Sequence, residues 1–121
     1  MRNYQTLDAW KVAMALVKDV YIVLKNYPKE ELFALTSQTK RAAVSIPANI
    51  AEGMGRQYKK DTIQFLHIAR GSAFEVETLL NIAVMVGIMQ EKIFIKFTAS
   101  LDDVIKLLNG LINYMEKAKL K

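Results

Sequence analysis

Apolar residues recur at alternating steps of three and four along most of the chain, and this spacing restricts the fold to packed α-helices. Near the N-terminus the repeat comprises Leu7, Trp10, Met14, Val17, Tyr21 and Leu24. It predicts a helix over about residues 7–27, which Pro28 ends. Near the C-terminus a second repeat forms one seam of Phe94, Phe97, Leu101, Val104, Leu108, Leu111 and Met115. No segment shows the alternation typical of a β-strand.

Two further helices fill the middle of the chain. Residues 61–86 carry two apolar seams. One seam comprises Leu66, Ala69, Ala73, Val76, Leu80 and Ala83, and the other Phe65, Ile68, Ser72, Glu75, Leu79, Ile82 and Val86. A shorter helix begins at Thr36 or Ser37, after a turn over residues 29–33, and ends at Gly53 and Gly55, which suit a C-terminal cap. We therefore expect an all-α protein, an up-down-up-down four-helix bundle, with residues 1–121 as a single domain.

The chain holds more apolar surface than one four-helix core requires. A core needs about 3 apolar positions per heptad, whereas 52% of this chain is hydrophobic. The positions outside the main seams include Ala9, Val12, Leu16, Ile22, Val23, Ile93, Ile105, Leu107, Ile112 and Tyr114. Surplus apolar surface on a soluble chain is typical of subunit contacts. The sequence therefore predicts a homo-oligomer.

A polar stripe runs along the helix expected over residues 36–56. Its members are Gln38, Arg41, Ser45, Asn49, Glu52 and Arg56. Pro47 lies inside this helix, where a proline costs about 3 kcal/mol. We interpret Gln38, Arg41, Ser45, Asn49, Glu52, Ser72 and Glu75 as a structural polar network that fixes the register of two helices. The alternative is that Glu52 and Glu75 act as a catalytic or metal-binding carboxylate pair.

The sequence offers few residues for catalysis. It contains no cysteine and one histidine, His67, so one chain supplies neither a two-histidine metal site nor a nucleophilic triad. Residues 53–56, Gly-Met-Gly-Arg, follow a helix instead of a strand, which does not fit a phosphate-binding glycine loop. We expect no enzymatic activity, no catalytic or metal-ligating residue and no cofactor.

Basic residues are the second candidate for function. The chain has 17 Lys and Arg against 12 Asp and Glu, a net charge of +5. The candidate nucleic-acid-binding residues are Lys11, Lys18, Lys25, Arg56, Lys59, Lys60, Lys92 and Lys96, and Lys117, Lys119 and Lys121 form a basic tail. A lysine stripe is most often solvated helix surface, but a ring of subunits would multiply these patches into a strong field for a polyanion. Residues 61–89, with one arginine and three acids, are the least suited to phosphate.

The hydropathy pattern predicts a soluble, cytoplasmic protein without membrane association. The longest uncharged run, residues 78–90, has 13 residues, and about 20 are needed to span a bilayer. The first eight residues lack the apolar core of a signal peptide. The absence of cysteine is compatible with a reducing compartment.

Several segments resemble one family over nearly the whole chain. The string Ser-Ile-Pro-Ala-Asn-Ile-Ala-Glu-Gly at residues 45–53 is followed by Gly55-Arg56 and by Phe-Leu-His-Ile-Ala-Arg-Gly-Ser-Ala-Phe-Glu at residues 65–75. With residues 7–10 and 35–38, these segments are similar to the bacterial four-helix-bundle proteins encoded in intervening sequences of large-subunit ribosomal RNA genes. The family motif falls on Arg41, Ser45, Asn49, Glu52, Ser72 and Glu75, which we interpret as structural.

The resemblance implies an assembly and a partner. Members of this family form ring-like pentamers, and the related accessory variability protein of diversity-generating retroelements is a basic pentamer that binds nucleic acid and its reverse transcriptase. The expected function is therefore a non-enzymatic, pentameric adaptor that binds RNA or DNA. The alternative is a protein–protein scaffold without nucleic-acid binding, and an enzyme using Glu52 or Glu75 is the least favoured.

Overall fold

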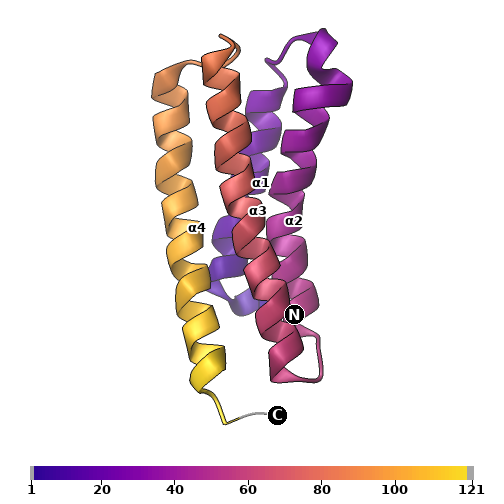
Figure 1. Ribbon diagram of the computed structural model, residues 1–121, viewed down its shortest axis with the longest axis vertical. Helices are drawn as coiled ribbons and strands as arrows, with labels where there is room; N and C mark the ends of the chain where they lie inside the picture. The colour runs from indigo at the N-terminus through magenta and orange to yellow at the C-terminus, as the bar shows by residue number, and fades with distance from the viewer. Residues whose placement is uncertain (1, 120–121) are drawn as a thin grey trace.

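The computed structural model describes residues 2–119, which form four long α-helices and no β-strand (Figure 1). The helices are α1 (Asp8–Leu24), α2 (Ser37–Met54), α3 (Lys59–Met85) and α4 (Glu91–Lys117). Three short elements complete the fold: the 3₁₀-helices η1 (Asn3–Thr6) and η2 (Lys29–Glu31), and the π-helical turn η3 (Leu32–Thr36). The all-α prediction is confirmed. The first helix ends three residues earlier than predicted, because Lys25, Asn26 and Tyr27 form tighter turns by hydrogen bonding to carbonyls three residues back.

Each helix packs against two others. α1 and α3 both contact α2 and α4, and the most extensive contact is between α2 and α3. The α1–α2 and α3–α4 connections lie at one end of the molecule, and the α2–α3 connection lies at the other end beside the last turn of α4 (Figure 1). We call these the upper end (residues 25–36 and 86–90) and the lower end (residues 55–60 and 116–119).

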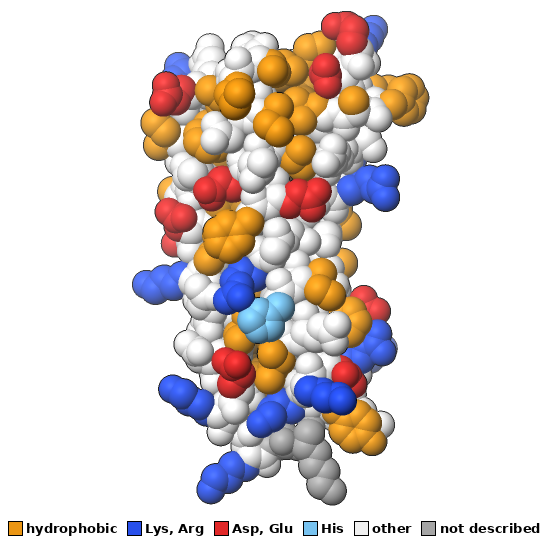
Figure 2. Space-filling view, in the orientation of Figure 1, with side chains coloured by type: hydrophobic (Ala, Val, Ile, Leu, Met, Phe, Trp, Pro, Cys, Tyr) orange, Lys and Arg blue, Asp and Glu red, His pale blue; other side chains and the backbone are white. Residues whose placement is uncertain are grey.

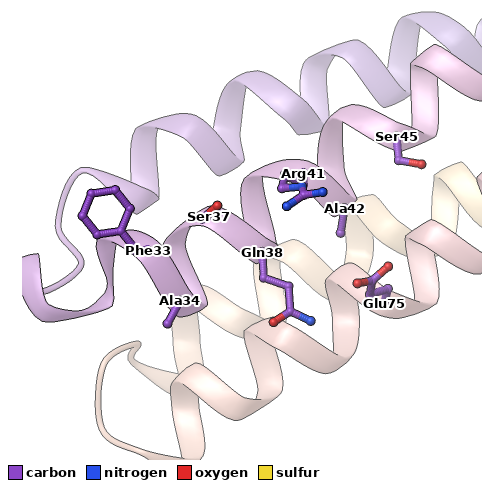
Figure 3. Close-up of a pocket in the computed structure, with 8 residues that line it drawn as sticks. All are labelled: Phe33, Ala34, Ser37, Gln38, Arg41, Ala42, Ser45 and Glu75. Atoms are coloured by element: carbon purple, nitrogen blue, oxygen red, sulfur yellow. The ribbon is translucent and has the colours of Figure 1, made fainter.

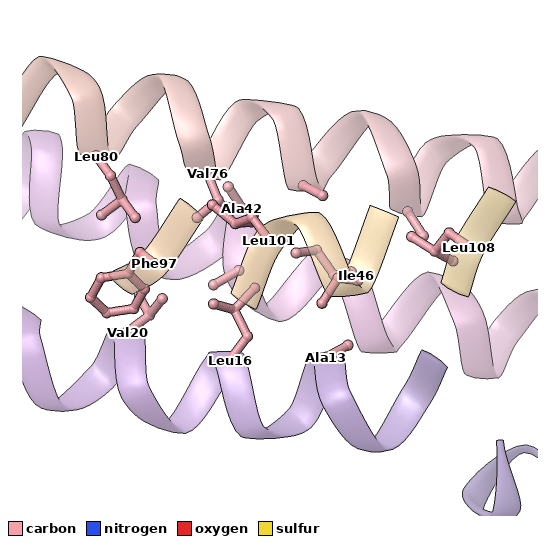
Figure 4. Close-up of a cluster of buried hydrophobic side chains, with 14 of the residues drawn as sticks. Ala13, Leu16, Val20, Ala42, Ile46, Val76, Leu80, Phe97, Leu101 and Leu108 are labelled. Atoms are coloured by element: carbon pink, nitrogen blue, oxygen red, sulfur yellow. The ribbon is translucent and has the colours of Figure 1, made fainter. Parts of the chain in front are cut away.

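The core takes apolar side chains from all four helices (Figure 4). The largest fully buried side chains are Leu16, Val20, Ile46, Ile50, Leu66, Val76, Leu80, Leu101, Val104 and Leu108. Alanines with no exposed surface lie between them, which lets neighbouring helices approach closely; they are Ala13, Ala43, Ala69, Ala73 and Ala83. The first predicted seam of α3 is therefore confirmed, since all its members are fully buried.

The predicted core face of α1 is wrong in part. Met14 and Tyr21, expected in the main seam, are 43% and 41% exposed. The buried face instead consists of Ala9, Ala13, Leu16, Val20 and Leu24. Two apolar stripes lie side by side on this helix, and the one containing the small alanines faces the other helices. Tyr21 instead packs at the surface, with Lys40 Nζ 4.8 Å from its ring centre.

Part of the apolar surplus is used in the core, and part stays at the surface. Leu16 and Ile112, which were expected outside the main seams, are buried. In the second predicted seam of α3, Ser72 and Leu79 are buried, but Ile68, Ile82 and Val86 are exposed. The most exposed large apolar side chains are Phe33 (92%), Met85 (79%), Tyr114 (67%), Val86 (61%) and Ile95 (61%).

The end of α2 is fixed by packing and not by a left-handed glycine cap. Gly55 is the C-cap residue of α2, as predicted, but its φ of −88° is open to any residue, so the cap does not require glycine. Gly53 is required for a different reason: a Cβ there would lie 2.7 Å from the Cβ of Phe65 on α3. Thr62 Oγ1 donates a hydrogen bond of 2.7 Å to the Gly53 carbonyl at the same point. The small residue therefore allows α3 to pack directly against the last turn of α2.

Candidate nucleic-acid interface

Three residues of the predicted polar network join α2 to α3. The hydroxyl oxygens of Ser45 and Ser72 are 2.8 Å apart, and Asn49 Nδ2 donates to both the hydroxyl and the carbonyl oxygen of Ser45 at 2.8 Å. Ser72 is buried, while Ser45 and Asn49 are half-buried. Asn49 lies one turn beyond Ser45 on α2, so its amide group supports the hydroxyl that contacts α3.

Glu52, in the last turn of α2, forms its ion pair with Arg56, just beyond the end of the helix. Its carboxylate accepts a hydrogen bond of 3.1 Å from Arg56 Nη2, and the two side chains are 55% and 45% exposed. Arg56 also lies over the ring of Phe65, 4.6 Å from its centre. An exposed pair of this kind contributes little to stability. Among the described residues, Glu52 forms no hydrogen bond or ion pair with a side chain of α3.

The remaining network residues line an open groove between α2 and α3 (Figure 3). Gln38 and Arg41 come from α2 and Glu75 from α3, and all three side chains are exposed. The groove has a volume of about 590 Å³, and Phe33 lies at one end of it. No side-chain hydrogen bond or ion pair within residues 2–119 involves Gln38, Arg41 or Glu75. The structure thus brings three of the seven network residues together and leaves these three facing solvent.

Basic side chains gather at the lower end, where Figure 2 shows several Lys and Arg close together. Arg56 lies in the α2–α3 connection, Lys60 in the first turn of α3, and Lys117 and Lys119 at the end of α4; all four are exposed. Lys121 of the predicted basic tail lies outside the described residues.

Lys59 differs from these residues because it has a structural role. Its Nζ donates to the carbonyl oxygens of Ala118 at 3.0 Å and Glu116 at 3.5 Å. A lysine in this position satisfies carbonyls that the helix end leaves free. Lys59 is therefore engaged at the end of α4 and is less available to a phosphate than its neighbour Lys60.

The other basic candidates lie elsewhere. Lys11, Lys18 and Lys25 are exposed along α1, spread over about 21 Å of helix. Lys92 and Lys96 are exposed in the first turns of α4, at the upper end. The eight predicted nucleic-acid-binding residues therefore do not form one continuous surface in a single chain.

One hydrogen-bonded group was not predicted from the sequence. Arg70 Nη1 donates to Asn109 Oδ1 at 2.7 Å, and Arg70 Nη2 donates to His67 Nδ1 at 2.8 Å. The spacing of His67 and Arg70 on one helix is compatible with contact. Asn109 is 39 residues further along the chain, on α4, so its part depends on how α3 and α4 pair.

No helix within residues 2–119 combines the length and the apolar content that crossing a bilayer requires.

Comparison with known proteins identifies the family. Residues 5–110 match the family model described as 23S rRNA-intervening sequence protein, as the resemblance in the sequence indicated. A solved structure, a protein with unknown function from the S23 ribosomal protein family of Bacteroides thetaiotaomicron VPI-5482, has the same fold, with a TM-score of 0.80. The two chains are 24% identical, and the match covers 87% of this chain and 95% of the other. No curated protein matches. The chain therefore belongs to the 23S rRNA-intervening sequence protein family.

Proposed function

We propose that this protein is a non-enzymatic, homo-oligomeric adaptor that binds RNA through basic side chains contributed by several subunits, with five subunits as the expected number. The observation that carries the proposal is the group of exposed basic residues at the lower end. We call this group the basic end; it consists of Arg56, Lys60, Lys117 and Lys119. The family description, which names a ribosomal RNA intervening sequence, supports RNA as the polyanion.

The physical argument for RNA is electrostatic. Lys and Arg side chains that approach phosphates release condensed counterions, and this release supplies most of the non-specific affinity. Four such side chains in one subunit give weak binding. Copies of the same surface side by side in an oligomer would strengthen it, because each further subunit binds the same strand at another point.

The exposed apolar side chains support oligomerisation. Phe33, Met85, Val86 and Ile95 are each more than 60% exposed and lie at or near the upper end. Burial of such side chains between subunits would remove apolar surface from water, which stabilises the assembly by about 25 cal/mol for each Å² buried.

Sedimentation equilibrium at micromolar concentration should give a mass several times that of one chain. A stable monomer would contradict this part of the proposal.

The RNA-binding part is tested with two charge-matched variants. The first replaces the basic end (Arg56→Gln, Lys60→Gln, Lys117→Gln, Lys119→Gln), and the control replaces four exposed lysines at the upper end (Lys25→Gln, Lys29→Gln, Lys92→Gln, Lys96→Gln). Filter binding at low salt should show a loss of about ten-fold or more for the first variant and a smaller loss for the control. Equal losses would mean that net charge, and not the basic end, determines binding. A DNA competitor of the same sequence tests whether RNA is preferred.

A second candidate function is a protein–protein scaffold. It is supported by the open groove between α2 and α3, with the highly exposed Phe33 at its end. The expected relation of this family to the retroelement accessory protein makes a reverse transcriptase one predicted partner. For this function the wild-type protein would show no RNA retention even at low salt, and neither charge variant would differ from it.

A further inference from the structure

The hydrogen bonds around Arg70 hold two planar groups at the surface of α3. Both terminal nitrogens of the guanidinium are engaged, one with Asn109 and one with His67. An arginine is always protonated and can only donate, so Nδ1 of His67 accepts and its ring carries a proton on Nε2. His67 is exposed and Arg70 is half-buried. The imidazole and the guanidinium are therefore fixed in orientation next to solvent.

An exposed aromatic ring follows on the same side of α3. Phe74 is 51% exposed and lies one turn beyond Arg70. Residues four apart on a helix are neighbours, with about 5–6 Å between their Cβ atoms. The cation–π contacts found within residues 2–119 join Lys40 to Tyr21 and Arg56 to Phe65, so Arg70 does not cover the Phe74 ring. About half of the Phe74 side chain is therefore accessible to a ligand.

We propose that His67, Arg70 and Phe74 form a stacking surface for the unpaired bases of single-stranded RNA. This inference rests on the proposed RNA-binding function and names the form of RNA recognised. Proteins that recognise single strands stack bases on aromatic rings, histidines and arginine planes. A base inside a duplex has both faces covered by its neighbours and cannot stack in this way.

The stacking surface is in line with Lys60 of the basic end. Lys60, His67 and Phe74 recur every seven residues, so they lie along one side of α3. The helix rises about 21 Å from Lys60 to Phe74, a length that about six stacked nucleotides span at 3.4 Å each. Figure 2 shows the chain's single histidine on this face, above the basic residues of the lower end.

Acidic residues lie beyond Phe74, at the end of the stacking surface that is away from the basic end. Glu77 lies one turn beyond Phe74 on α3, and Asp102 and Asp103 lie on α4 toward the same end, because Asn109 is opposite Arg70. These carboxylates disfavour phosphates beyond Phe74. The backbone of the strand would therefore run toward the basic end, with bases instead of phosphates against α3. This arrangement agrees with the scarcity of positive charge in residues 61–89.

The test compares two RNA probes by fluorescence anisotropy: an unstructured strand of about twelve nucleotides, within the range that small single-strand binders cover, and a duplex of the same length. The variants are Phe74→Leu, which keeps an apolar side chain but removes the ring, and Arg70→Lys, which keeps the charge but removes the planar fork. The matched control is Tyr21→Leu, which removes a ring that is 41% exposed on α1, away from α3. Thermal melting and sedimentation confirm that each variant folds and assembles as the wild type does.

We expect Phe74→Leu and Arg70→Lys to weaken binding of the single strand by about ten-fold, in the range measured for base–aromatic stacking. Duplex binding should change little, and Tyr21→Leu should leave both affinities unchanged. Equal single-strand affinity for wild type and both variants would overturn the inference but leave the proposed function intact. Wild-type protein that binds neither probe would overturn both.

Discussion

Ser45 on α2 and Ser72 on α3 share a hydrogen bond of 2.8 Å between their hydroxyl groups, in the most extensive helix contact of the bundle. Asn49 Nδ2 donates to the same Ser45 hydroxyl, so this oxygen is bonded from both helices. Ser72 is buried, which means that water cannot replace a missing partner. The hydrogen bond links α2 to α3 directly at this level of the bundle.

This hydrogen bond predicts a measurable coupling. Ser72→Ala should lower the free energy of unfolding by about 1 kcal/mol, the typical net value of one hydrogen bond. The double variant Ser45→Ala/Ser72→Ala should lose less than the sum of the two single changes, because either change alone already breaks the bond. Urea unfolding measures all three. The control is Ser100→Ala, whose long 3.5 Å bond stays within α4; fully additive losses would contradict the assignment.

Gly53 should be intolerant of any side chain. A Cβ there would lie 2.7 Å from the Cβ of Phe65 and 3.2 Å from the Thr62 carbonyl oxygen, so α3 would have to move. Gly53→Ala should therefore destabilise the fold by about 1–3 kcal/mol. Gly110→Ala is the control, since nothing lies within 4 Å of its added Cβ. In an exposed helix interior this change should stabilise by about 0.5–1 kcal/mol. Thermal unfolding that gives the two variants the same sign would refute the packing argument.

Tyr27 should make stability fall at alkaline pH. Its buried hydroxyl has no hydrogen-bond partner among the described residues, and burial raises the pKa of Tyr27 from 10.0 to about 12. The folded state holds this proton more firmly than the unfolded state does. The protonated Tyr27 therefore makes its full contribution to the free energy of unfolding below pH 10, and this contribution is lost as the pH rises toward 12.

Tyr27→Phe tests this effect. The variant should match or exceed the wild type in stability at neutral pH, by up to about 1 kcal/mol, because it removes an unpaired buried hydroxyl. It should also lose less stability between pH 10 and 12. Urea unfolding across this range measures the difference, and Tyr114→Phe, at a ring that is 67% exposed, is the control. Parallel losses in wild type and Tyr27→Phe would assign the alkaline effect to other groups.

Lys59 should stabilise the last turn of α4. Its ammonium donates to the carbonyl oxygens of Ala118 and Glu116, and a cation at a helix C-terminus contributes about 0.3–1 kcal/mol. Lys59→Gln should therefore increase amide hydrogen exchange in residues 113–118. Lys60→Gln removes the same charge from the neighbouring exposed position and should leave that exchange unchanged. Equal exchange in the two variants would exclude the cap.

The parts of the fold that could be predicted are those with one clear pattern. The repeat of α4 forms a single seam, and most of its members are buried: Phe97, Leu101, Val104, Leu108 and Met115. On α1 the pattern is ambiguous, because large and small apolar residues form two adjacent stripes. Which stripe faces inward depends on how closely α2 and α4 approach, and periodicity contains no information about that distance.

The candidate site was predictable only where its residues are close in sequence. Asn49 and Ser45 are one turn apart, and so are Glu52 and Arg56, so their contacts follow from helical spacing. Ser72 and Asn109 depend on the register between helices, which no local pattern specifies. For the same reason Lys92 and Arg56 were both candidates for nucleic-acid binding, although they lie at opposite ends of the bundle.

The salt dependence of RNA binding tests the central claim most directly. For a single strand, the logarithm of the association constant falls linearly with the logarithm of salt concentration, with a slope of about −0.7 for each phosphate that the protein neutralises. The wild type should show such a slope. The variant without Arg56, Lys60, Lys117 and Lys119 should show a shallower one, by about 0.7 for each phosphate that it no longer neutralises. An unchanged slope in that variant, or wild-type affinity that does not depend on salt, would contradict the account.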